Sequence, residues 1–314
     1  MLPYERDLSK LLEKIDELEE FCLQRNFNLQ PEIQLLRERV KMIEQEIYQN
    51  LTAFERVHLA RLAERPGTAD YISAIFPDFL ELHGDRCFGD DPSIMGGIAT
   101  LEGVPVTVIG NRKGSEAREN VKYNFGMAHP EGYRKARRLM LQAEKFGRPV
   151  ITFVDTPGAY PGTGAEERGQ GEAIAQNLFL MSHLRVPIIS VLIGQGGSGG
   201  ALALAVADRL LMLENAFFSV ISPEGCASIL FKDAGRAREA AEALKLTARD
   251  LYELKLIDEI IPEPLGGAHR DKAGMAARIK ERLLHHLREL LRKDIVELVN
   301  SRFDRYRRVG LEFI

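Results

Sequence analysis

Two apolar runs in the middle of the chain, 149–154 (PVITFV) and 186–193 (VPIISVLI), constrain the fold more than any other feature of the sequence. Runs of this kind suit strands that are buried on both faces. Helical patterns at 131–146 and 169–184 alternate with them, a β-hairpin is predicted at 98–109, and 209–213 and 217–221 supply further strands. This alternation predicts an α/β fold built from stacked βαβ units.

Each apolar run leads directly into a loop of small residues. The first loop is 155–164 (DTPGAYPGTG), and the second is 194–200 (GQGGSGG), in which five of seven residues are glycine. Ligands of parallel α/β layers bind beyond the C-terminal ends of the strands, and adjacent strands bring their loops together there. We therefore expect the two loops to lie side by side and to form a binding site.

Phosphate binding is one possible reason for the glycines at 194–200. A P-loop needs a lysine after its last glycine, but Ala201 follows here. A dinucleotide fingerprint matches formally at 194–199, with Glu214 at the required distance. The strand before that match is not the first of its unit, which disfavours this interpretation.

A nucleophilic serine and a set of backbone donors are the other two possibilities. Ser198 lies at a strand-to-helix turn that is reminiscent of a nucleophile elbow, but none of the seven histidines has a fitting context. We expect Ser198 to cap the following helix instead. A glycine loop that opens a helix also offers free N–H groups to a developing oxyanion. Close packing of helix on sheet would explain one or two of the glycines.

The two ends of the chain have helical patterns. Apolar residues spaced by three and four at 8–22 and again at 33–47 predict a helical hairpin that is broken near Pro31. Leucines between 283 and 298 predict one long amphipathic C-terminal helix. We expect three units: a helical segment at 1–65, an α/β domain at 66–270 and a helical extension at 271–314.

Composition and charge narrow the class of protein. The net charge of −4 argues against a general nucleic-acid-binding or membrane-surface protein. The three cysteines are far apart and form no CxxC pair, so neither a zinc ribbon nor a disulfide framework is expected. The N-terminus has no signal-peptide pattern and no apolar run is long enough to span a membrane, so we expect a cytoplasmic location.

Several unusual blocks of sequence occur in a fixed order. They are 155–162 (DTPGAYPG), 164–170 (GAEERGQ), 196–203 (GGSGGALA), 222–228 (SPEGCAS) and 262–269 (PEPLGGAH). With 124–127 (NFGM), 130–135 (PEGYRK) and the N-terminal helical segment, they resemble the carboxyltransferase α subunits of bacterial acetyl-CoA carboxylase. The resemblance covers nearly the whole chain.

This resemblance implies a crotonase (ClpP-like) superhelix of ββα units and a specific reaction. The family transfers a carboxyl group from carboxybiotin, held on a separate biotin carboxyl carrier protein, to the thioester acetyl-CoA, and so makes malonyl-CoA for fatty acid synthesis. It implies a β subunit that carries a four-cysteine zinc ribbon, an α2β2 arrangement and a biotin carboxylase partner. No metal is expected in this chain.

The resemblance also implies roles for residues of the two loops. The amides of Gly199 and Gly200 are expected to form an oxyanion hole for the ureido oxygen of biotin, while Gly196 and Gly197 shape the approach to it. The facing wall of the pocket is expected from Asp155, Gly158, Ala159 and Tyr160. We interpret Asp155 as an acceptor that organises its loop, and no side chain is a compelling general base.

Three other functions remain possible from the sequence. A subunit of a related biotin-dependent acyl-CoA carboxylase or decarboxylase would have a similar pattern. A crotonase-type hydratase would require well-placed catalytic carboxylates, and a non-catalytic scaffold would use the hairpin and the glycine loop for assembly alone.

Some charged and polar segments have simpler interpretations. The basic run with Arg112, Lys113, Arg118 and Lys122 is expected to be a solvated loop, with CoA phosphates as an alternative ligand. The basic residues at 134–138 are expected on the solvent face of their helix. Ser222 should cap a helix with Pro223 at its first position, and Cys226 should be a buried small residue.

Overall fold

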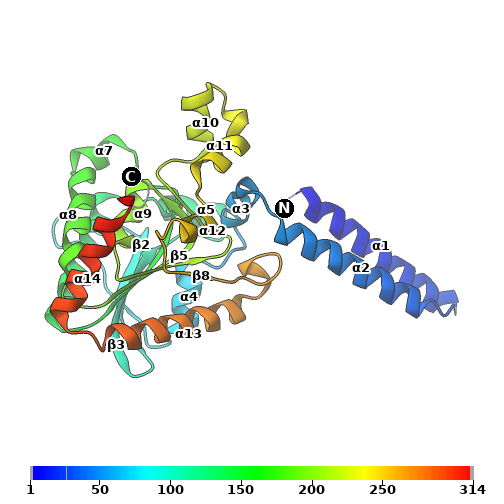
Figure 1. Ribbon diagram of the computed structural model, residues 1–314, viewed down its shortest axis with the longest axis horizontal. Coiled ribbons are helices and arrows are strands. Elements are labelled where there is room, and N and C mark those ends of the chain that lie inside the picture. The colour runs from blue at the N-terminus through cyan, green and yellow to red at the C-terminus, as the bar shows by residue number, and fades with distance from the viewer. Residues whose placement is uncertain (1–2, 26, 312–314) are drawn as a thin grey trace.

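The computed structural model describes residues 3–25 and 27–311, which form a mixed α/β body with a projecting helical hairpin (Figure 1). One eight-stranded sheet has the order β1-β2-β3-β4-β5-β6-β8, and β7 pairs with the end of β5. The strands are β1 (Leu80–Glu81), β2 (Ile94–Leu101), β3 (Val104–Asn111), β4 (Val150–Thr156), β5 (Ile188–Gly197), β6 (Arg209–Leu213), β7 (Phe217–Ser219) and β8 (Glu259–Ile261).

The sheet is antiparallel at one edge and parallel over the rest. β1, β2 and β3 pair antiparallel, and the predicted hairpin turns at Glu102 and Gly103 between β2 and β3. β3, β4, β5, β6 and β8 pair parallel in that order. All seven residues of β4 are buried, as expected for a central parallel strand with helices on both faces.

Helices cover both faces of this sheet. α6 (Pro130–Lys145) contacts β2 and β3, and α9 (Ser198–Ala205) contacts β4 and β5. α4 (Thr68–Ile75) lies on the face opposite α6. A Cβ on Gly96 would meet Leu139 of α6, whereas a Cβ on Gly110 would meet Thr68 of α4. Gly110 follows Ile109, the partner of Gly96 in β3, and successive residues of a strand point to opposite faces. α8 (Gln170–His183) packs against α6 and α9, and α13 (Lys272–Leu290) packs against α4.

The N-terminal hairpin forms as the sequence predicts. α1 (Pro3–Arg25) and α2 (Gln30–Gln49) lie antiparallel, and Pro31 falls in the first turn of α2. The buried seam between them contains Ile15, Cys22, Ile33 and Val40. The hairpin projects away from the body in Figure 1, and α3 (Ala53–Ala60) leads the chain back onto the body, where it packs against Phe217.

The remaining helices are short. They are α5 (Ala117–Lys122), α7 (Thr163–Glu167), α10 (Pro223–Phe231), α11 (Ala237–Leu244) and α12 (Ala248–Glu253), with single 3-10 turns at Asn124–Gly126, Ala234–Arg236 and Ala268–Arg270. Ser222 accepts a hydrogen bond from the Gly225 amide at the start of α10, as predicted. Thr247 forms a capping box with Asp250 at the start of α12. Cys226 is buried, also as predicted.

The prediction of one long C-terminal helix is wrong. Two helices, α13 and α14 (Ile295–Arg308), are separated by a break at 291–294. Asp294 accepts a hydrogen bond from the Val296 amide at 2.9 Å and caps α14. The break lets α14 pack on α8, where the buried Arg302 pairs with Asp208 at 2.7 Å.

The prediction that Lys135 faces solvent is also wrong. Its side chain is fully buried, because the loop before β2 folds over α6. Its ammonium donates to Asp90 at 2.6 Å and to the carbonyl of Asp91 at 2.7 Å. Among the described residues, no helix is both long and apolar enough to cross a bilayer. The division of the chain at 65 and 270 stays a prediction.

Candidate active site

The two loops that were expected to meet do lie side by side. β4 and β5 are neighbouring parallel strands, and Thr156 pairs with Gly196 where the strands end. β5 does not stop at 193 as predicted but continues to Gly197, so the first half of the glycine loop is strand. The second half opens helix α9. The site is therefore a strand-to-helix junction that lies against the loop after β4.

Four of the five glycines are required by close packing. A Cβ on Gly194 would lie 2.5 Å from the carboxylate of Asp155, and one on Gly196 would lie 2.6 Å from the side chain of Leu192. A Cβ on Gly197 would overlap the carbonyl of Pro157, and one on Gly200 would lie 2.5 Å from the carbonyl carbon of Gly158. Close packing thus explains more of the glycines than the sequence suggested.

Gly199 differs from the other four. A Cβ at this position would have only ordinary contacts, 3.7 Å from the side chain of Ile174. Gly199 is partly exposed and lies in the first turn of α9, where the amides have no preceding helical turn to supply acceptors. The packing of the described chain does not require glycine here.

Ser198 does not cap α9, so that prediction is wrong. The N-cap residue is Gly197, and no side-chain hydrogen bond caps the helix. Ser198 instead takes a positive φ of 46°, which is uncommon for a residue other than glycine. This conformation turns the chain sharply from β5 into α9 and leaves the serine side chain exposed.

Asp155 connects the two loops through its carboxylate. Its Oδ1 atom accepts a hydrogen bond from the Gln195 amide at 2.8 Å and one from the Lys113 ammonium at 2.5 Å. The Asp155 amide donates to Asn111 at 3.3 Å. Lys113 was expected in a solvated loop, but its side chain is only 17% exposed and points to this carboxylate. No sequence pattern pointed to Asn111.

The loop after β4 is held by a network of hydrogen bonds. Thr156 Oγ1 accepts from the Gly158 amide at 3.1 Å and donates to the Gly158 carbonyl at 2.6 Å. Gln170 donates to the carbonyl of Tyr160 at 2.9 Å, and the ring of His129 stacks on Tyr160 at 4.1 Å between centroids. Gln170 and His129 were not predicted to act here, although Gln170 belongs to one of the unusual blocks.

A buried ion pair is hydrogen-bonded to the strand residue directly before the glycine loop. Arg65 donates from Nε to the carbonyl of Ile193 at 2.8 Å, directly before the loop, and its guanidinium forms a bidentate pair with Glu263. Burial disfavours the charged carboxylate, but the charge and hydrogen bonds of Arg65, with further hydrogen bonds from Asn215, outweigh it. The pKa of Glu263 therefore lies below its ordinary value. No sequence pattern pointed to this pair.

A cavity of about 550 Å³ lies beside the two loops, within the usual size range of a ligand pocket. Its lining includes Arg61, Lys113, Asp155, Gln195 and Lys272 but not Gly199 or Gly200. Phe125 also lines it and holds a left-handed backbone with φ 56°. Strained residues of this kind are concentrated at functional sites.

Solved structures identify the fold of the chain. The chain superimposes on transcarboxylase 12S, solved with methylmalonyl-coenzyme A bound, with a TM-score of 0.61 and 20% identity; the match covers 76% of this chain and 45% of that one. A second match is a Pseudomonas malonate decarboxylase hetero-tetramer in complex with coenzyme A, with a TM-score of 0.60 and 19% identity. That match covers 78% of this chain and 98% of that one. The fold is the predicted crotonase-like α/β fold.

The family follows from sequence comparison. Residues 1–310 match the family described as "Acetyl co-enzyme A carboxylase carboxyltransferase-like". The acetyl-coenzyme A carboxylase carboxyl transferase subunits alpha of Listeria welshimeri and Staphylococcus carnosus are 53% and 54% identical over 310 residues, which is 99% of this chain and 98% of each relative. The chain belongs to this family, as its blocks of sequence indicated.

Proposed function

We propose that the chain is the α half of a carboxyltransferase that, with a β subunit, transfers a carboxyl group from carboxybiotin to acetyl-CoA and forms malonyl-CoA. Full-length identity of 53–54% to proteins named as the alpha subunit of this enzyme supports the assignment. The reaction would be the first committed step of fatty acid synthesis.

The observation that carries this proposal is the open position at Gly199. Packing explains the other glycines of the loop, whereas the space next to Gly199 is bounded only at 3.7 Å by Ile174. The missing side chain keeps the N-terminus of α9 accessible to a ligand oxygen. Free amides and the positive end of a helix dipole favour negative charge at such a position.

The residues present fit a ureido group at this position. Bound carboxybiotin, carried on a separate protein, would supply the carboxyl group that is transferred. The amides of Gly199 and Gly200 would donate to the ureido oxygen and stabilise the negative charge that develops there. Gly196 and Gly197 would shape the approach.

The loop after β4 would form the wall opposite these amides, through Asp155, Gly158, Ala159 and Tyr160. The Asp155 carboxylate already accepts hydrogen bonds from Lys113 and from the Gln195 amide. It would therefore hold the loops in place rather than remove a proton from substrate.

Exposed apolar side chains on the elements that follow the glycine loop are in keeping with a partner subunit. Val220 follows β7, which pairs with the glycine-loop end of β5, and is 75% exposed. Leu202 of α9 and Ile229 and Leu230 of α10 are also exposed. Apolar surface of this kind commonly marks an interface. We propose the zinc-ribbon β subunit as its partner, in an α2β2 assembly that also works with the biotin carboxyl carrier protein and biotin carboxylase.

Reconstitution tests the function. The purified chain and a β subunit together should form malonyl-CoA from acetyl-CoA and carboxybiotin, while neither alone should do so. The Gly199→Ala variant keeps its amide but places a methyl group in the approach to it. It should therefore lower kcat, at most by roughly the 10²–10³-fold that the loss of one oxyanion-hole contact costs.

Gly171→Ala is the matched control. Gly171 also lies in the first turn of a helix, α8, and a Cβ there would have no neighbour within 4 Å. It should keep full activity. Full activity of a folded, assembled Gly199→Ala variant would refute the oxyanion assignment. No malonyl-CoA from the complete mixture would refute the function itself and leave a scaffold role.

A further inference from the structure

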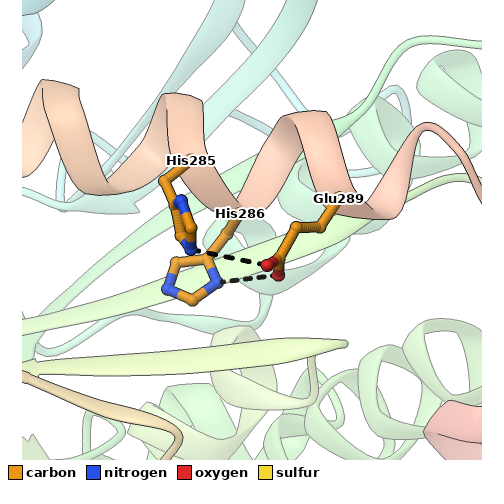
Figure 2. Close-up of side chains that lie close together, drawn as sticks. All are labelled: His285, His286 and Glu289. Atoms are coloured by element: carbon orange, nitrogen blue, oxygen red, sulfur yellow. Dashed lines mark ion pairs between the residues drawn. The ribbon is translucent and has the colours of Figure 1, made fainter.

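Three side chains from one stretch of α13 gather at a single point of the surface. His285, His286 and Glu289 turn their ring nitrogens and carboxylate toward one another (Figure 2). His285 Nε2 lies 3.4 Å from one carboxylate oxygen of Glu289, and His286 Nδ1 lies 3.8 Å from the other. The three donor atoms fall within 4.8 Å of one another. Glu289 is four residues from His285 and three from His286, so it shares a helix face with each histidine.

His286 is oriented from behind by a carboxylate of the sheet. Its side chain is only 9% exposed, and its Nε2 atom lies 2.6 Å from Glu259 Oε2 at the start of β8. An ionised carboxylate can only accept a hydrogen bond, so Nε2 carries a proton. In the neutral imidazole, Nδ1 then keeps a lone pair. Metal-binding histidines are commonly held in this way, with a carboxylate on the far ring nitrogen.

The Nδ1 atom of His286 has no hydrogen-bond partner. It is buried and has no hydrogen bond, which is uncommon for a buried polar atom. It faces the Glu289 carboxylate at 3.8 Å, a gap that is too long for a hydrogen bond. When the ring is neutral, two acceptors therefore point toward each other. A cation between them would satisfy both.

We propose that His285, His286 and Glu289 bind a zinc ion, with water in the fourth position and Glu259 as the outer carboxylate that orients His286. Two imidazoles and one carboxylate are a ligand set that Zn²⁺ accepts readily. His285 and Glu289 are 49% and 45% exposed, so the ion can enter from solvent. Because Glu259 lies on β8, the bound ion would strengthen the attachment of α13 to the sheet.

Two arginines compete for the same carboxylates. Arg209 lies 3.6 Å from Glu289, and Arg282 contacts Glu259 at 2.5 Å. The Arg282 contact leaves the Glu259–His286 hydrogen bond in place. Arg209 would be displaced from Glu289 by the ion, so Arg209→Gln should tighten zinc binding, whereas a purely structural role of Glu289 predicts no such gain.

The test is a zinc titration of the full chain after treatment with a chelator, followed by calorimetry and by metal analysis of the desalted protein. We expect one Zn²⁺ per chain, and Co²⁺ in its place should give the visible absorption of a tetrahedral site. His285→Ala and Glu289→Gln change exposed side chains and should each weaken binding at least tenfold. Glu259→Gln should weaken it roughly 10–100-fold, the usual effect of losing an outer-shell partner.

His183→Ala and Cys87→Ser are the controls, because they remove potential ligands from other parts of the described surface. Circular dichroism would establish that each variant is folded. The proposal is refuted if the wild-type chain shows no saturable zinc binding, or if the combined His285→Ala, Glu289→Gln variant binds zinc as tightly as the wild type.

Discussion

The buried pair of Arg65 and Glu263 allows a sharp test of how the catalytic loops are supported. Glu263→Gln keeps the size of the side chain but removes its charge. The side chains of Arg65 and Glu263 are 3% and 0% exposed, so the guanidinium would be left buried without a counter-ion. Breaking such a pair typically costs about 3–5 kcal/mol of unfolding free energy, and we expect a loss in this range.

The Glu263 carboxylate accepts hydrogen bonds from several donors besides Arg65, so Glu263→Gln should disturb more than the ion pair. Its oxygens accept hydrogen bonds from the amides of Asn215 at 3.0 Å and Ala268 at 2.8 Å. A glutamine provides one acceptor oxygen and places an NH2 group against donors. Because Arg65 also binds the carbonyl of Ile193, the reconstituted enzyme should lose activity as well as stability.

Urea unfolding followed by circular dichroism measures this loss. Glu253→Gln is the control, since Glu253 forms an ion pair with Arg249 in which both partners are exposed. That substitution should change stability by no more than about 0.5 kcal/mol. If Glu263→Gln were as mild as the control, the buried pair would not support the loop and the reasoning would be wrong.

Three further predictions follow from contacts around the same loops. Gly200→Ala should destabilise the chain by about 1–3 kcal/mol, because its Cβ would meet Gly158. Gly199→Ala should leave the urea midpoint unchanged or higher, because alanine favours the helix. Equal losses of stability in the two variants would contradict the packing argument. Lys113→Met should cost roughly 1.5–3 kcal/mol by leaving Asp155 without its cation, and Lys113→Arg should restore most of it in the same assay. The pKa of Glu263 is lowered in the folded state, so its contribution to stability is full above the unfolded pKa and is lost as pH falls through the folded pKa. Below pH 4.5, the ordinary pKa of this group, the urea midpoint of Glu263→Gln should therefore fall less steeply with pH than that of the wild type.

Local sequence patterns predicted most of the secondary structure because short-range physics decides it. The caps at Ser222 and Thr247 depend on a side chain and an amide three residues away. The hairpin of α1 and α2 depends on spacing within each helix. The strands β4 and β5 depend on continuous apolar runs, which are stable only when both faces are buried.

The errors lie where distant segments decide the outcome. Lys135 carries no local sign that Asp90 will fold over it. The break at 291–294 serves the packing of α14 on α8, which a continuous leucine pattern does not reveal. Ser198 was expected to be a cap, but the junction of β5 with α9 places Gly197 at that position.

The candidate site shows the same division between sequence and tertiary structure. The sequence by itself determined that two small-residue loops follow adjacent buried strands, and its blocks identified the family, because both depend on residues close together along the chain. Only the tertiary structure decided what each glycine meets: Gly194, Gly196, Gly197 and Gly200 pack against neighbours, and Gly199 faces open space. It also decided that Lys113, Arg65 and Glu263 converge on these loops. Contacts between residues 42 to 198 positions apart arise only when the sheet has formed.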